Sequence, residues 1–299
     1  MDTYLSPSTR QFLDRLAETT RRMEQAQNQI SSGKKLTQVS DDPDQVSTLL
    51  QTRAELESCE QVQQNLGRVK TEVDTAEQAL TSAAQILQNA RTVAAQGASS
   101  NVTQETRNIL AGQVQSMMEH MASIANSTVE GRFVFSGDAD SSPAFALDFT
   151  HTPPYGTYLG QPAMRQVIAA DGSTFNSSLD GGSLFDAPGN SVFAALDQVR
   201  TALLSGVDDN ITAASQNLIG VEDYFGSRHA AYGAIQTRVN DAIDVASKRQ
   251  VSLQTQVGSI EDADLSTAIV EFANASTNRN AALQAEAQMP RKSLFDYFA

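Results

Sequence analysis

The chain has 299 residues, of which 40% are hydrophobic, so it can bury a sizeable core and is not expected to be disordered throughout. Its formal net charge of −14 argues against nucleic-acid binding, which needs a basic stripe, and against docking on an anionic membrane. Its one cysteine, Cys59, allows neither an intrachain disulfide nor a cysteine-based metal cage. We expect no membrane span and no cleaved signal peptide, because no sufficiently long apolar run is present.

The first 30 residues predict a weakly amphipathic helix. Their apolar positions form a sparse stripe at helical spacing: Leu5, Phe12, Leu16, Met23 and Ile30. Such a stripe buries little surface, and an isolated helix of this quality is marginal in water. We therefore expect this segment to be poorly ordered alone and to pair only on assembly.

A helix start is predicted at residues 40–43. Asp42 can cap the helix, and Pro43 suits the first helical position, where its missing N–H has no cost. The acidic cluster of Asp41, Asp42 and Asp44 has two interpretations at this point, helix capping or a contact between subunits.

Heptad patterns follow this start. Over residues 59–94 the apolar positions alternate in steps of three and four, which is the pattern of a coiled-coil seam. A helix over 44–96 would be roughly 80 Å long and needs antiparallel partners. Two further stripes, over 110–124 and 232–260, supply them, and residues 97–101 predict the turn before the second stripe.

The middle of the chain has a different composition. Eight Phe and Tyr residues fall between Phe133 and Phe185, where prolines and glycines also gather. This composition predicts a turn-rich insertion with strands. We expect the preceding helix to stop at Gly131 and a later helix over 192–204 to end at Gly206.

The last 40 residues carry a second sparse stripe, formed by Leu265, Ile269 and Phe272 and followed mostly by alanines. The two terminal stripes have too little partner surface within one chain. Apolar stripes without a partner indicate association with another molecule.

These elements predict a mainly α fold, an elongated antiparallel helical rod with terminal coiled-coil helices and a small β-rich insertion (α+β). We divide the chain into three parts. Residues 1–42 pair with 261–299, residues 43–131 and 190–260 form the rod, and residues 132–189 form the outer insertion.

No motif for catalysis or metal binding is evident, so we expect no enzyme, no cofactor and no metal. Phosphate-loop and nucleophile-elbow patterns do not occur. Asp138, Asp140 and Ser142 alternate like the start of a calcium loop, but the glycine and distal glutamate of that loop are missing. The three histidines lie far apart in the sequence: His120, His151 and His229.

Motifs at both ends of the chain resemble the flagellin superfamily. Residues 29–36 (QISSGKKL), followed by 40–43 (SDDP), resemble its N-terminal signature. Residues 260–265 (IEDADL) resemble its shared C-terminal motif.

Two further motifs resemble the hook-associated protein 3 group of that superfamily. These are residues 131–137 (GRFVFSG), followed by Pro143 and Phe145, and the ending KSLFDYF at 292–298. The resemblance covers about residues 1–137 and 190–299.

The resemblance implies an extracellular structural subunit that joins hook to filament and leaves the cell by flagellar type III export without a cleaved signal peptide. The implied partners are hook-associated protein 1, flagellin, further copies of the chain in a ring of about eleven, and a dedicated export chaperone. The chaperone would contact Leu265, Ile269, Phe272 and Leu283. The predicted subunit interface consists of Leu5, Phe12, Leu16, Met23, Ile30, Asp41, Asp42, Leu265, Ile269, Phe272, Leu294 and Phe295.

Two alternatives remain open at the level of sequence. The chain could be a flagellin that polymerises on its own. It could instead belong to another class, as a helical-rod binding or signalling module or an enzyme whose site lies in the insertion. A pocket with convergent polar groups in residues 132–189 would favour the enzyme.

Overall fold

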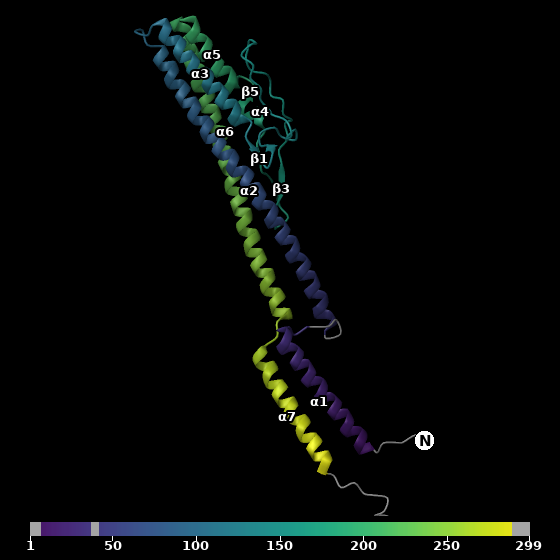
Figure 1. Cartoon of the computed structure of the whole chain (residues 1–299). Helices are drawn as coiled ribbons and strands as arrows, with labels where there is room; N and C mark the ends of the chain where they lie inside the picture. Colours follow the sequence, from purple (N-terminus) through teal and green to yellow (C-terminus); the bar gives the residue numbers. More distant parts are fainter. Residues whose placement is uncertain (1–6, 37–41, 289–299) are drawn as a thin grey trace, which may run out of the picture. The chain divides into compact units, whose positions relative to one another are not determined.

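The computed structural model describes residues 7–36 and 42–288 (Figure 1). In these ranges it contains seven helices and three short strand pairs, so the predicted mainly α class is confirmed. The chain divides into two compact units. Unit 1 comprises Met1–Ser58 and Gln250–Ala299, and unit 2 comprises Cys59–Arg249.

The two longest helices are α2 (Pro43–Gly97) and α6 (Asp208–Glu261). Helix α2 begins as predicted, because Pro43 is its first residue and the Asp42 carboxylate accepts a hydrogen bond from the Gln45 N–H at 3.1 Å. It ends at Gly97, where the predicted turn follows. The capping interpretation of Asp42 is therefore the one that the structure supports.

In unit 2, α2 and α6 run antiparallel, side by side (Figure 1). Lys70 donates to Asn240 at 2.9 Å, and Gln236 donates to Asp74 at 2.8 Å. Every residue of the predicted seam over 59–94 is buried or half-buried. The heptad pattern thus identified both the helix and the face that packs.

Two shorter helices complete the bundle of unit 2, α3 (Gln104–Ala125) and α5 (Val192–Ser205), which pack against each other. Helix α5 ends as predicted, because Gly206 adopts a left-handed φ of +70° as its C-cap. The buried Arg107 of α3 joins the helix ends, since it donates to the Gly97 carbonyl at 3.1 Å and to the Gly206 carbonyl at 2.6 Å, and pairs with Asp208.

The predicted helix stop at Gly131 is wrong. Helix α3 ends at Ala125, and a hairpin of β1 (Thr128–Val129) and β2 (Arg132–Phe133) follows. Glu130 and Gly131 form its two-residue turn with φ of +51° and +79°. A tight hairpin turn with two positive φ values requires such residues, so this glycine serves a strand pair and not a helix end.

The insertion contains strands, as predicted, but they are only two or three residues long. Strand β3 (Gln166–Ile168) pairs with β4 (Thr174–Asn176), and β5 (Asp186–Ala187) pairs with β6 (Asn190–Ser191), all antiparallel. A short helix, α4 (Gly181–Phe185), lies between them in sequence. The rest of the insertion is mostly irregular chain.

An aromatic cluster centred on Phe185 holds the insertion to the helices. The Phe185 ring centroid lies 5.3 Å from that of Phe135, 5.5 Å from that of Phe145 and 5.7 Å from that of Phe225 on α6. Such contacts add stability beyond area burial. The concentration of aromatic residues between 133 and 185 is therefore explained by packing, not by strand content.

Truncation of Leu184, next to this cluster, should destabilise unit 2. Its side chain is fully buried, so Leu184→Ala leaves a cavity and should lower the free energy of unfolding by about 3 kcal/mol. Leu159→Ala is the matched control, because Leu159 is 60% exposed and its loss should cost less than about 0.5 kcal/mol. Chemical denaturation measures both values, and equal losses would refute this account of the core.

Candidate assembly surface at the chain ends

The two chain ends pair with each other in unit 1. Helix α1 (Pro7–Ser32) packs antiparallel against α7 (Leu265–Gln288) (Figure 1). The structure therefore differs from the expectation that these segments pair only on assembly. The reason is that the alanines beside the sparse stripe of α7, Ala268 and Ala275, give α1 a partner face within the same chain.

The seam between α1 and α7 buries small side chains. Ala26, Ala268 and Ala275 are 2%, 3% and 6% exposed and are the buried residues of these two helices among those described. The larger apolar residues of the seam are only half-buried: Phe12, Leu16, Met23, Ile30 and Phe272. Alanine lets helices approach closely but removes little apolar area from water, so the seam is thin.

Much of the apolar surface of α7 stays exposed. Leu265, Ile269 and Leu283 are 47%, 55% and 44% exposed. With Phe272 they lie at helical spacing along one side of α7, and we call these four residues the α7 stripe. Two further exposed apolar residues were not predicted from the sequence. They are Leu13 of α1, which follows Phe12, and Val270 of α7, which follows Ile269.

The remaining predicted interface residues have different positions. Asp42 is engaged as the cap of α2. The other four lie outside the described residues: Leu5, Asp41, Leu294 and Phe295. The interface as a whole therefore stays a prediction.

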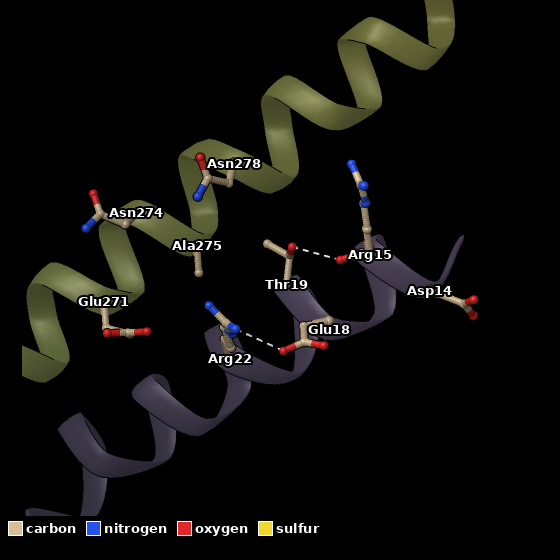
Figure 2. A pocket seen from close by; sticks show the side chains of 9 residues that line it. All are labelled: Asp14, Arg15, Glu18, Thr19, Arg22, Glu271, Asn274, Ala275 and Asn278. Atoms are coloured by element: carbon tan, nitrogen blue, oxygen red, sulfur yellow. Dashed lines mark hydrogen bonds and ion pairs between the residues drawn. The ribbon is translucent and has the colours of Figure 1, made fainter. Parts of the chain in front are cut away.

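A polar groove follows the seam (Figure 2). Arg22 pairs with Glu18 at 3.0 Å, and the Thr19 hydroxyl donates to the Arg15 carbonyl at 2.9 Å. No nucleophile–base pair is present among the lining side chains, which could instead form hydrogen bonds and ion pairs with a partner helix. The groove is lined by Asp14, Arg15, Glu18, Thr19, Arg22, Glu271, Asn274, Ala275 and Asn278.

An ion cluster around the buried Glu261 carboxylate lies between the end of α6 and the start of α7. The Glu261 side chain is 7% exposed and pairs with both Lys34 and Arg53. Beside it, the Lys35 N–H donates to the Glu261 carbonyl at 2.6 Å, and the Ala263 N–H donates to the Gly33 carbonyl at 2.9 Å. We call the Glu261–Lys34–Arg53 cluster with these two hydrogen bonds the Glu261 clasp.

Electrostatics favour the ionised form of Glu261. The hydrogen bond from Lys34 is the largest influence and lowers the pKa of Glu261 below its ordinary value of 4.5. Burial opposes this shift, and Arg53 reinforces it. Sequence reasoning missed the clasp, because Arg53 and Glu261 are 208 residues apart.

Two residues that were considered as possible nucleophile or metal ligand, Cys59 and Asp140, make contacts typical of structural roles. Cys59 is buried and its thiol donates to the Ala246 carbonyl at 3.4 Å, whereas Asp140 pairs with Arg165 at 3.0 Å. Within residues 7–36 and 42–288, no group of three or more His, Cys, Asp or Glu side chains could hold a metal ion. Over the same ranges, no helix combines the length and apolar character needed to cross a bilayer.

Both ends of the chain match models of one protein family. The bacterial flagellin N-terminal helical region matches residues 7–140, and the bacterial flagellin C-terminal helical region matches residues 225–298. Together the matches cover more than half of the chain. No curated protein sequence matches at a significant level.

Several solved structures share this fold. A proposed flagellar hook-associated protein from Vibrio parahaemolyticus is 21% identical, with a TM-score of 0.66 over 74% of this chain and 100% of that chain. FlgL from Bacillus cereus is 19% identical, with a TM-score of 0.59 over 70% and 99%. The flagellar hook associated protein-3 from Legionella pneumophila is 12% identical, with a TM-score of 0.60 over 72% and 98%. These likenesses establish a common fold.

Acid should loosen the Glu261 clasp. Because the pKa of Glu261 is lowered in the folded state, its contribution to the free energy of unfolding is complete at neutral pH and is lost as the pH falls from 4.5 through the folded-state value. Thermal unfolding of wild type and Glu261→Gln between about pH 7 and about pH 3 measures this. The Tm difference between the two proteins should shrink towards the acidic end, and a constant difference would contradict the assignment.

Proposed function

Because this chain belongs to the flagellin family, we propose that it is a structural subunit of the bacterial flagellum that joins hook to filament. It acts by helix packing and not by catalysis. The observation that carries this proposal is the α7 stripe, apolar surface that the chain's own α1 leaves uncovered. Leu265, Ile269 and Leu283 are each about half exposed.

The stripe has the energetic character of an incomplete interface. Covering the exposed part of one such side chain gains on the order of 1 kcal/mol. Each residue of the stripe adds a free-energy gain of this kind, and each further copy in an assembly adds the same set. Burial of apolar surface is therefore enough to favour association, and no catalytic step is needed. The polar groove beside the stripe would supply hydrogen bonds that fix the orientation of the partner helix.

The position between hook and filament is supported by the names of two fold relatives, which are described as flagellar hook-associated proteins. On this proposal the partners are hook-associated protein 1 on one side, flagellin on the other, and further copies of the chain in a ring of about eleven. A flagellin that polymerises on its own is the alternative within the same family.

Exposed apolar stripes are a hazard before assembly, because they promote aggregation. A dedicated export chaperone that covers Leu265, Ile269, Phe272 and Leu283 would remove this hazard. Export through the flagellar type III channel, without a cleaved signal peptide, would then deliver the subunit outside the cell.

Deletion of the locus tests the proposed position directly. Cells without the junction subunit should complete hooks and release a separate flagellin, unassembled, into the medium. Microscopy and analysis of the secreted protein measure both effects. Normal filaments would overturn the proposal, and loss of filaments with no released flagellin would favour the self-polymerising alternative.

A polar substitution in the α7 stripe should block assembly and spare folding. Ile269 is 55% exposed, so Ile269→Ser should change the free energy of unfolding by less than about 0.5 kcal/mol but weaken subunit association about tenfold. The matched control is Ile109→Ser, because Ile109 in unit 2 is 61% exposed. Each variant is tested for its ability to restore filaments to the deletion strain. If both variants restored filaments equally well, the α7 stripe would not be part of the subunit interface.

A further inference from the structure

The fully buried part of the seam between α1 and α7 does little to fix the register of the two helices. Its buried residues are all alanines, at 26, 268 and 275. Residues 268 and 275 are one heptad apart, so a shift by two turns would bring one alanine to the place of another. Small, uniform side chains interlock weakly, and the larger apolar residues of the seam are only half-buried, so the seam alone resists sliding weakly.

The Glu261 clasp lies at the end of this seam and has the opposite character. Its carboxylate is 7% exposed, whereas the side chains of Lys34 and Arg53 are 49% and 42% exposed. The carboxylate therefore sits beneath two cations, and its hydrogen bonds are directional. Lys34 lies two residues after α1 ends at Ser32, and Glu261 lies four residues before α7 begins at Leu265.

Stability alone does not explain a buried carboxylate at this place. Removing charges from water costs free energy, and apolar residues of similar volume often serve equally well. The best attested use of a buried polar group in a helical seam is to specify register, since misaligned pairings leave the group without partners. The backbone hydrogen bonds between Lys35 and Glu261 and between Ala263 and Gly33 set the same alignment.

We propose that the Glu261 clasp is a register lock for the α1–α7 pair. With the clasp closed, α1 and α7 start from fixed points and the alanines meet in one alignment. The register decides which part of α1 lies opposite each residue of α7, so it also decides where along the pair the α7 stripe stands. The inference concerns the isolated subunit and stands independently of the proposed place in the flagellum.

Disulfide trapping across the seam tests the lock in the purified full chain. In a Cys59→Ala background, Ala26→Cys is combined either with Ala268→Cys, which lines the same stretch of groove, or with Ala275→Cys, one heptad further along α7. Glu261→Gln should slow cross-linking of the 26–268 pair about tenfold and should raise that of the 26–275 pair. Glu57→Gln is the matched control, because Glu57 is exposed in the same unit and should leave both rates unchanged.

A second variant separates alignment from stability. Glu261→Met keeps the buried volume and replaces the carboxylate's ion pairs with apolar burial, so its Tm should fall less than that of Glu261→Gln, while the 26–268 preference should be lost equally in both. Circular dichroism confirms that α1 and α7 remain helical in each variant. Unchanged cross-linking in Glu261→Gln and Glu261→Met would overturn the register lock. Loss of helicity in both variants would also overturn it, since a register lock is not needed for helix formation.

Discussion

The structure depends on a shortage of apolar partner surface at the chain ends. Helices α1 and α7 meet through alanines, so their pairing removes little apolar area from water. The bulkier residues are half-buried at the seam, as Phe12 and Phe272 are, or exposed beside it, as Ile269 is. The two helices therefore pack against each other, but their pairing leaves apolar side chains of α7 exposed to solvent. An assembly of several such pairs can bury what one pair cannot.

Unit 2 shows what the same chain does where partner surface is plentiful. Leu66, Leu80 and Leu87 on α2 are fully buried, and the aromatic cluster around Phe185 joins the insertion to α6. Arg107 satisfies the carbonyls at two helix ends. Unit 2 and the α1–α7 pair therefore differ in the volume of the side chains that they bury, which are large in unit 2 and are alanines between α1 and α7.

Local signals in the sequence predicted local structure well. The bounds of α2 and α5 follow from Pro43 and Gly206, and the seam of α2 follows from its heptads. The helix end predicted at Gly131 was wrong, because a glycine with positive φ suits a hairpin turn as well as a helix end. The pairing of residues 1–42 with 261–299 was a prediction from the two terminal stripes, whereas the Glu261 clasp could not be read from spacing, since Arg53 and Glu261 are 208 positions apart. Of the candidate site, the stripe on α7 was predicted from sequence, whereas its exposure required the structure.

The most direct measurement is the chemical accessibility of residue 269 before and after assembly. A thiol introduced by Ile269→Cys can be labelled in the isolated subunit and in subunits built into completed flagella, with Cys59 buried in the body of the molecule. The account predicts rapid labelling in the isolated subunit and strong protection in the flagellum. Equal labelling in both states, or protection already in the isolated subunit, would contradict it.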